Sequence, residues 1–446
     1  MDEFIRDLGD GLIMRRSTQM DAEKLAAFNA KIHSEDESDA RGLSDWTLDL
    51  MSGSHPTFGV EDFTIIEDTI DHKIISAMNL ISQIWMYEGI PFKVGRPELV
   101  GTLPEFRSRG LVGKQFEVIH QWSVERGELV QAITGIPYYY RRFGYEMALN
   151  LDGGRSGYAP NVIKLKDGES ESYLIREAQE QDLALIANLY DLGCKRSLVS
   201  VQWNEALWHY ELNGKQRYNI NGRRLFVIED DSHTPVGFVA VPGVKWRKMT
   251  AVTAFELLPG VSWFKVTPSL VRWLWKLGED QGKEQNLSHE IFGFWLGDEH
   301  PAYTAYGDRL PRVREPYAWF LRVPDMVKFL QLISPALEKH LLGTMLEGYS
   351  GDLTLSFYHE GVRMQFEGGK VTKIDRLVNG ELGKGTEGEG VSAAFPDKTF
   401  LHILFGWRSL KEVKHLFPDC EWRNNEVKTL IETLFPRKVS TLWPIS

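Results

Sequence analysis

The run VGTLPEFRSRGLVG at residues 100–113 restricts most strongly what this chain can fold into. Its apolar start is typical of the end of a strand, Pro104 of a loop, and the residues after Gly110 of an amphipathic helix. The start of such a helix exposes unpaired backbone N–H groups and the positive end of the helix dipole, which together bind an anion. Gly110 permits close approach of a ligand to the backbone, and Arg107 and Arg109 add positive charge. The run therefore predicts a strand–loop–helix site for a phosphate or pyrophosphate group.

A charged helix cap beside a tight turn would use the same residues, so the neighbouring elements decide between the two interpretations. Strands are predicted at residues 11–16, 63–67, 74–87, 99–103, 129–134 and 145–151, and helices at 21–32 and 110–126. A turn is predicted at residues 94–97, and the pattern ends in the glycine-rich run at residues 152–157. The alternation of strands and helices predicts an α/β domain over residues 1–158, which favours the anion site.

The same order of elements returns in the next part of the chain. Strands are predicted at residues 172–175, 225–228, 235–241, 251–257, 291–295 and 319–323, with helices from about 180 and at 268–277. This order predicts a duplicated domain over residues 159–323. The loop LPGVSW at residues 258–263 has no Arg-x-x-Gly sequence, so we expect this second copy to serve as a scaffold. Residues 324–446 separate their strands from their helices, which is typical of an α+β domain.

Composition excludes several classes of function. The chain has 446 residues with 51 Lys and Arg against 62 Asp and Glu, so its formal charge of −11 disfavours a nucleic-acid partner and suits a cationic amine. Cys194 and Cys420 are the only cysteines and no His-Glu-x-x-His pair occurs, so no metal site is expected. The chain has no run of about 18 apolar residues and its acidic start lacks a signal-peptide core, so we expect no membrane partner and a cytoplasmic location.

A second informative run, GIPYYYRRFGY, occupies residues 135–145. Together the two runs resemble the GNAT acetyltransferase superfamily, whose coenzyme A motif is [QR]-x-x-G-x-[GA] and whose catalytic tyrosine lies in a Tyr-x-x-Phe-Gly-Tyr segment. Residues 107–112, RSRGLV, match the motif except at Val112, where the family has a small residue. The enhanced intracellular survival (Eis) branch has Pro-x-x-Arg-x-Arg-Gly-Leu at this place, as residues 104–111 do.

The resemblance to Eis-like proteins extends over the whole chain. They have an active acetyltransferase domain, a degenerate second copy and a C-terminal domain like sterol carrier proteins. Residues 404–409, 417–420 and 434–436 look like parts of that last domain. The resemblance thus implies tandem GNAT-like domains, each a mixed and mostly antiparallel sheet flanked by helices, followed by a sterol-carrier-like α+β domain, in a homo-oligomer.

The resemblance also implies a chemistry and a set of residues. The co-substrate would be acetyl-CoA, without a metal, and the acceptor would be a primary amine of a cationic small molecule or of a lysine. The expected cofactor-binding residues are Val100, Gly101, Thr102, Leu103, Arg107, Ser108, Arg109, Gly110, Leu111, Val112 and Gly113.

Tyr140 is the expected general acid, because a phenol with a pKa near 10 keeps its proton at neutral pH and can donate it to sulfur. A packing role for Tyr140 is the alternative, and Tyr138 or Tyr139 are alternative acids in the same run. By resemblance the carboxylate of Ser446 is the base; a chain of waters is the alternative. The acidic run at residues 33–39 either attracts a cationic amine or is a solvated loop.

Two other functions compete with catalysis. The chain could be an acyl-CoA-binding protein without turnover. It could also carry a hydrophobic ligand in its C-terminal domain, whose apolar side chains could line a cavity or equally fill a core: Phe357, Met364, Phe366, Phe395, Phe400 and Phe405.

Overall fold

A nine-stranded sheet forms the centre of the N-terminal part of the molecule in the computed structural model, which describes residues 4–378 and 390–442. The strand order is β1-β2-β3-β4-β5-β6-β17-β7, and β10 pairs with the far end of β4. The strands are β1 (Ile5–Gly9), β2 (Leu12–Arg16), β3 (Phe63–Asp68), β4 (Ile74–Tyr87), β5 (Ile90–Thr102), β6 (Val130–Ile133), β7 (Glu146–Leu151), β10 (Val199–Val201) and β17 (Tyr317–Arg322).

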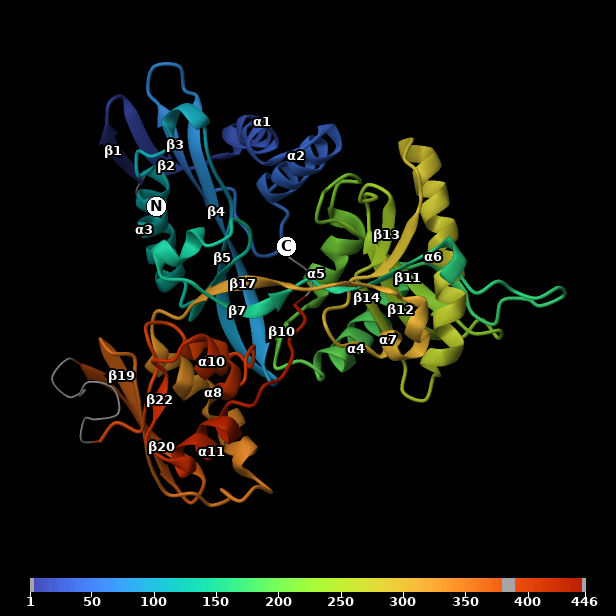
Figure 1. The fold of residues 1–446 in the computed structure, drawn as a ribbon. Coiled ribbons are helices and arrows are strands. Elements are labelled where there is room, and N and C mark those ends of the chain that lie inside the picture. Colours follow the sequence, from blue (N-terminus) through green and yellow to red (C-terminus); the bar gives the residue numbers. More distant parts are fainter. Residues whose placement is uncertain (1–3, 379–389, 443–446) are drawn as a thin grey trace.

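Three helices cover this sheet, with α3 (Leu111–Glu125) on one side and α1 (Ala22–His33) and α2 (Glu37–Met51) on the other (Figure 1). The helix α2 replaces the loop that was one interpretation of the acidic run. Its N-cap Asp36 accepts a hydrogen bond of 2.9 Å from the Asp39 N–H, and the acidic first turn suits the positive end of the helix dipole. Acidic residues that suggest a solvated loop are therefore the start of a helix.

The turn predicted at residues 94–97 is wrong, because β5 continues through it and the chain reverses instead at Glu88 and Gly89, which both have positive φ. Pro97 is tolerated in the strand for a geometric reason. It faces Leu80 of β4, whose N–H bonds to Asp62 on the opposite side, so this pair makes no hydrogen bonds between the two strands. The nitrogen of Pro97 therefore points away from β4, toward the edge of β5 where the pairing with β6 has ended. No N–H donor is needed there.

The middle of the chain forms two four-stranded sheets, with orders β14-β12-β11-β9 and β13-β15-β8-β16. Their strands are β8 (Gly154–Tyr158), β9 (Leu174–Glu177), β11 (Arg223–Glu229), β12 (Pro235–Pro242), β13 (Met249–Val252), β14 (Ala254–Leu257), β15 (Ile291–Phe294) and β16 (Arg312–Arg314). The helices of this part are α4 (Leu183–Cys194), α5 (Glu205–His209), α6 (Trp263–Gln285) and α7 (Pro301–Tyr306).

The first two parts of the chain exchange strands. β17 follows the second repeat in sequence but lies between β6 and β7, and β8 follows the first repeat but lies between β15 and β16. Figure 1 shows β17 crossing from the second part into the first. Each sheet is therefore completed by a strand from beyond its own run of sequence.

The C-terminal part is α+β, as expected, and its sheet has the order β20-β19-β18-β21-β22. Its elements are α8 (Met326–Leu341), β18 (Gly351–Ser356), β19 (Glu360–Glu367), β20 (Lys370–Val378), β21 (Ala393–Ala394), α9 (Phe400–Leu404), α10 (Leu410–Leu416), β22 (Glu421–Trp422) and α11 (Asn425–Leu434). The six apolar side chains considered for a ligand cavity are each at most 7% exposed and belong to one hydrophobic cluster. They fill a core.

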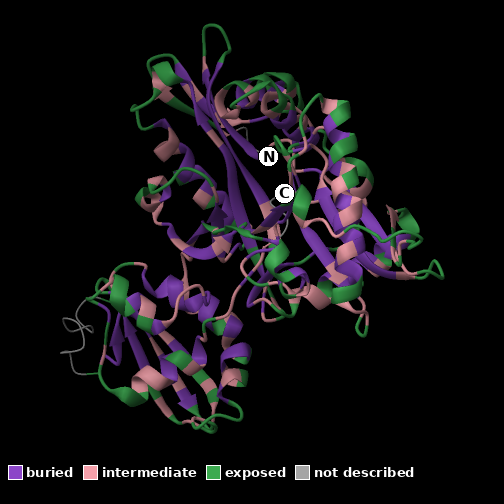
Figure 2. Cartoon of the chain, turned by 45° about the vertical axis from the view of Figure 1, so that its right-hand side comes forward, coloured by how far each residue is buried: buried purple, intermediate pink, exposed green. Residues whose placement is uncertain are grey.

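One hydrophobic cluster joins all three parts of the molecule. It begins at the β4–β5 hairpin with Trp85 and Phe92, passes through Trp208 of α5, and continues to Phe329 and Phe405 of the C-terminal part. Buried strands accordingly form a continuous interior in Figure 2, with exposed residues mainly on helix faces and loops. In the part of the chain that the structure describes, no helix is long and apolar enough to cross a membrane.

Candidate active site

The sheet opens into a wedge between β5 and β6. These parallel strands pair only at Val94–Val130 and Gly95–Gln131, whereas β5 stays paired with β4 to its end. The register between β4 and β5 shifts by one residue after Glu98, and Leu99 there has a φ of 52°. We call this irregularity the β5 bulge. A bulge leaves one residue unpaired and bends its strand, which exposes backbone polar groups beside the wedge.

The predicted anion site follows directly from β5. A short 3₁₀ turn (Pro104–Phe106) leads to Arg107, whose Nε donates to the carbonyl of Thr102 at 3.3 Å. Gly110 is the N-cap of α3 with a φ of 74°, a conformation that glycine adopts without steric cost. No side chain caps the helix start, and the amide of Lys114 makes the first backbone hydrogen bond of α3, to the Gly110 carbonyl.

The side chains around this helix start are exposed: Arg107, Ser108, Arg109 and Gly110 all face solvent. Arg109 makes an ion pair of 2.9 Å with Asp10 and stacks on Phe106, so it is held near the helix start while staying accessible. Leu111 is buried and Val112 is half-buried against the core, so these two anchor the first turn of α3. Positive charge and unpaired N–H groups thus meet at one exposed point.

A buried hydrogen-bond network fixes α3 to the sheet, and sequence reasoning missed it. Gln115 of α3 accepts from the Ser76 hydroxyl at 2.7 Å and donates to the carbonyl and hydroxyl oxygens of Thr64, at 3.0 and 2.9 Å. The Ser76 hydroxyl also lies 2.7 Å from the carbonyl oxygen of Gly101 and 2.8 Å from the Thr102 hydroxyl. The network therefore joins β3, β4, β5 and α3 just behind the anion site.

Tyr140 lies in a 3₁₀ turn (Tyr139–Phe143) after β6 and is 3% exposed. Its ring packs edge-on against Phe320 of β17, at a centroid distance of 5.5 Å. Burial raises the pKa of its phenol far above the usual range, and the nearby Glu98 charge raises it further. Among the described residues no group hydrogen bonds its hydroxyl, so a protonated phenol is available for a ligand. Tyr139 is half-buried against it, and Tyr138 is 69% exposed.

Two charged side chains on β5 were not anticipated. Arg96 is fully buried, pairs with Glu98 and holds its guanidinium over the Trp319 ring at 4.8 Å. Burial raises the pKa of Glu98, and Arg96 acts against that rise. The only sequence signal was a charge pair spaced by two in an otherwise apolar strand, which places both side chains on one face.

His33 ends α1 directly beside the β5 bulge. A Cβ placed on Gly101 would lie 3.1 Å from its Nε2, so only glycine allows this close approach. Burial lowers the pKa of His33, although a hydrogen bond to the backbone of Leu99 acts in the opposite direction. Its buried Nε2 has no partner among the described residues. The ring is therefore neutral at pH 7 and offers an acceptor or donor next to the wedge.

Ser446 lies outside the described residues, whereas residues 439–441 bond to the segment that leads into β10. The Leu198 N–H bonds to the Val439 carbonyl, the Val199 N–H bonds to the Ser440 hydroxyl at 2.9 Å, and the Thr441 N–H bonds to the Ser197 hydroxyl. The C-terminal segment thus runs along the start of β10, between the first and second parts of the molecule (Figure 1).

The second repeat has a wedge of its own but no anion site. β13 pairs in parallel with β15, and the chain then moves to β14, which pairs with β12 instead. Glu256 and His300 help to line a cavity of about 430 Å³ in this wedge. The loop before α6 carries no arginine, so the start of α6 lacks the charge that distinguishes the start of α3.

Comparisons with known proteins agree with this geometry. Residues 14–148 match the family model of an acetyltransferase (GNAT) domain, and no curated protein is similar in sequence to this chain. A GCN5-related N-acetyltransferase from Anabaena variabilis ATCC 29413 is similar in structure, with a TM-score of 0.63, 12% identity, and 97% of this chain and 99% of that chain covered.

Two further structures show the same fold along nearly their whole length. A probable N-acyltransferase from Enterococcus faecalis V583 has a TM-score of 0.62 at 12% identity, with 96% of this chain and 97% of that chain covered. Eis1 from Mycobacterium abscessus has a TM-score of 0.58 at 12% identity, with 96% and 98% covered. Residues 14–148 therefore form an acetyltransferase domain of the GNAT family, and the chain as a whole has a multidomain fold similar to that of Eis1.

Proposed function

We propose that the chain transfers an acetyl group from acetyl-CoA to a primary amine, by direct attack in a ternary complex. The observation that carries this proposal is the convergence of the β5 bulge, the uncapped start of α3 and the Tyr140 hydroxyl around one wedge. They offer, in turn, polar backbone groups for the thioester, an anion site for the pyrophosphate and a proton donor for the sulfur.

In this proposal residues 100–103 hold the thioester and the pantetheine arm, and residues 107–113 hold the pyrophosphate. The amine nitrogen attacks the thioester carbonyl, the C–N bond forms, and the C–S bond then breaks. Tyr140 gives its proton to the departing thiolate. The ammonium formed on attack loses its proton to a base, so the products are an amide and the free thiol.

Two groups of the chain are candidates for that base. The resemblance to Eis-like proteins suggests the terminal carboxylate of Ser446, which lies outside the described residues. His33 is the second candidate, since its neutral ring and unpartnered Nε2 lie beside the β5 bulge. A chain of waters leading to either group would serve the same purpose.

The three parts take different roles in this proposal. Residues 1–158 form the catalytic domain, completed by β17, while residues 159–323 and 324–446 support it. The acceptor would be a small-molecule amine or a lysine, and the assembly a homo-oligomer in the cytoplasm, as the resemblance implies.

The decisive test follows the release of free coenzyme A from acetyl-CoA with a thiol reagent, over a panel of amines. In Tyr140→Phe we expect kcat to fall about 100- to 1,000-fold with little change in the KM for acetyl-CoA, because the phenol acts on the leaving group. Tyr138→Phe is the matched control and should keep near-normal kcat, since its ring is exposed.

Two further variants separate the candidate bases. Loss of activity in a chain ending at residue 442 would assign the base to the terminal segment, whereas loss in His33→Gln, with the acidic limb of the pH profile removed, would assign it to the imidazole. If Tyr140→Phe still releases coenzyme A at the normal rate when an amine is present, Tyr140 is not the general acid. Binding of acetyl-CoA without any release would indicate an acyl-CoA-binding protein.

A further inference from the structure

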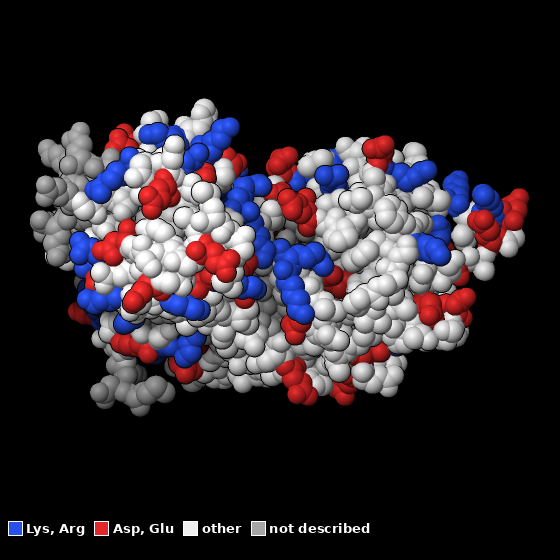
Figure 3. Space-filling model, turned by 90° about the horizontal axis from the view of Figure 1, so that it is seen from below, with Lys and Arg blue, Asp and Glu red and all other residues white. Residues whose placement is uncertain are grey.

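A second cavity, of about 480 Å³, opens on the sheet that β8 completes. Among its eleven lining residues five are Lys or Arg and none is acidic, in a chain whose formal charge is −11. Elsewhere charges of both signs are mixed, as on the face in Figure 3. We call this cavity, with Trp246, Trp295, Arg312 and Arg314 as its defining side chains, the basic cavity.

Its aromatic wall is already arranged for a planar ligand. Trp246 and Trp295 meet edge-to-face with centroids 5.1 Å apart, and Trp246 remains 48% exposed. The Arg314 guanidinium lies over both rings, 4.7 Å from the centroid of Trp295 and 5.4 Å from that of Trp246. Exposed tryptophan with stacked arginine offers both an apolar face and a charge.

Two of the arginines are available for an anion. Arg247 and Lys248 are engaged with Glu35 and Glu290, at 2.9 and 2.6 Å. Arg314 has only a longer ion pair of 3.6 Å to Asp152, and Arg312 has no ion pair among the described residues. Both have planar guanidinium groups, which suit the bidentate binding of a carboxylate or phosphate.

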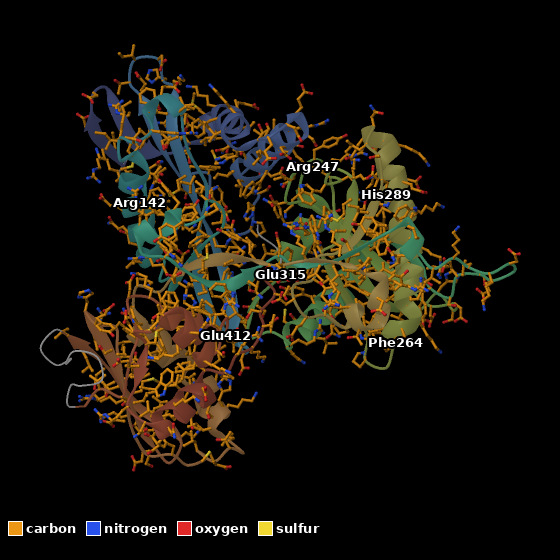
Figure 4. All side chains as sticks on the ribbon, in the orientation of Figure 1. Arg142, Arg247, Phe264, His289, Glu315 and Glu412 are labelled. Atoms are coloured by element: carbon orange, nitrogen blue, oxygen red, sulfur yellow. The ribbon has the colours of Figure 1, made fainter. Side chains whose placement is uncertain are left out.

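Two links connect the basic cavity to the elements around the wedge. Arg247, which is labelled in Figure 4, donates to Glu35 at 2.9 Å, and Glu35 is two residues beyond His33. Arg314 precedes Tyr317 by three residues, so their Cα atoms are within about 11 Å.

Tyr317 in turn lies close to Tyr140. Its phenol contributes to the raised pKa of Tyr140, and Phe320, three residues further along β17, packs edge-on against the Tyr140 ring. The strand that follows Arg314 in the chain therefore adjoins the tyrosine of the proposed reaction centre.

We propose that the basic cavity binds the far end of the acceptor, and that this acceptor is an amine whose other end carries an anionic group on a planar ring. This inference rests on the proposed function and specifies the chemical class of its acceptor. Arg312 and Arg314 repel a polyamine, whereas a carboxylate or phosphate pairs with them while the ring packs on Trp246.

The test compares 4-(aminomethyl)benzoate with its methyl ester and with spermidine as acceptors. We expect the carboxylate to have a KM at least about tenfold below that of the ester, and spermidine to be the poorest, because one charged contact corresponds to roughly that factor. Arg312→Gln and Arg314→Gln should each raise the KM for the carboxylate about tenfold without changing kcat or the KM for the ester. Replacing the benzoate by a phosphonate distinguishes a carboxylate site from a phosphate site.

Lys276→Gln is the control, since this exposed lysine on α6 also removes one charge but does not line the cavity. Calorimetric binding of 4-(aminomethyl)benzoate separates the two levels of the proposal. Binding that needs Arg312 and Arg314, with no acetylation of any amine, would overturn the proposed function and leave the ligand site. Equal binding in all variants, or a preference for spermidine, would overturn the basic cavity as the acceptor site.

Discussion

Burial shifts the pKa values of Tyr140 and His33 in opposite directions. Loss of solvent disfavours the charged form of each, so the pKa of the phenol rises and that of the imidazole falls. At neutral pH the tyrosine is therefore a proton donor and the histidine is uncharged. Their side chains also contribute few protein hydrogen bonds, which leaves both available to a ligand.

The same physics makes His120 a pH-dependent contributor to stability. Its ring lies 2.9 Å from the Tyr145 hydroxyl, and burial, with the charge of Arg322, lowers its pKa to about 3. The unfolded chain takes up this proton near pH 6.5 but the folded chain does not. Above about pH 6.5 the His120 ring does not lower the free energy of unfolding. Below that pH its titration lowers the free energy of unfolding by about 1.4 kcal/mol per pH unit, until the pH reaches about 3.

Replacing His120 by Gln, which can still bond Tyr145, should remove this contribution. Urea unfolding at about pH 6 and pH 4 measures the change, and the variant should lose less stability between them than the wild type. His415→Gln, an exposed histidine on α10, should leave the pH dependence unaltered. If the variant and the wild type lose the same stability between the two pH values, the His120 ring takes up its proton alike in the folded and unfolded chains.

At the scale of elements, the position of α3 decides whether an anion site exists. Its first turn must lie beside the end of β5, and a single side chain, Gln115, makes the polar connections that hold it there. The amphipathic face with Phe116 and Ile119 supplies the apolar contact but does not select one position along the helix axis. Directional hydrogen bonds make that selection.

In Gln115→Ala we expect a loss of about 1–3 kcal/mol in the free energy of unfolding, because Ser76 and Thr64 lose a buried partner. The KM for acetyl-CoA should rise as well, because the helix start is no longer fixed. Gln121→Ala is the control on the same helix, where the side chain is exposed and bonds only Glu125. A normal KM in a destabilised Gln115 variant would separate helix anchoring from coenzyme binding.

At the scale of the whole molecule, strand exchange and the β4–β5 hairpin bind the three parts together. The hairpin packs in the shared hydrophobic cluster, and the Tyr87 hydroxyl donates to the Leu404 carbonyl at 2.9 Å. Glu88 at its tip pairs with His340 at 2.8 Å and with Lys438 at 2.7 Å. These contacts connect the catalytic sheet to the C-terminal part and to the segment that leads to Ser446.

Glu88→Gln should therefore weaken the coupling between these parts. The hydrogen bond to His340, followed by that to Lys438, lowers the pKa of Glu88 to about 2, against the effect of burial. This contribution is present above the unfolded pKa, about 4.3, and is lost as the pH falls toward 2. We expect a destabilisation of about 1 kcal/mol at pH 7 in calorimetric unfolding, after allowance for solvent screening.

Glu117→Gln removes an exposed ion pair with Arg6 and serves as the control, with an expected change below about 0.5 kcal/mol. If Glu88→Gln, Glu117→Gln and the wild type have the same melting temperature, Glu88 does not couple the first sheet to the C-terminal part.

Local patterns were enough to place most elements and the strand–loop–helix arrangement at residues 100–113. The strand end, the glycine at the N-cap and the apolar face of α3 are all short-range features, and residues 107–113 lie where the pattern predicts. The acidic helix start at Glu37 and the continuation of β5 through Pro97 were missed. The first depends on a capping side chain, and the second on which neighbour pairs with each edge of the strand.

What the sequence determined by itself was therefore the strand–loop–helix arrangement at residues 100–113 and the tyrosine run at residues 135–145, because both consist of contiguous residues. Only the tertiary structure decided which distant residues lie beside the first sheet. β17 and His33 are far apart in the chain, and the pairing of β17 with β6 and β7 and the packing of α1 on β5 bring them to that sheet. Pairing between distant strands is set by the register and packing of the whole sheet, which no local pattern encodes.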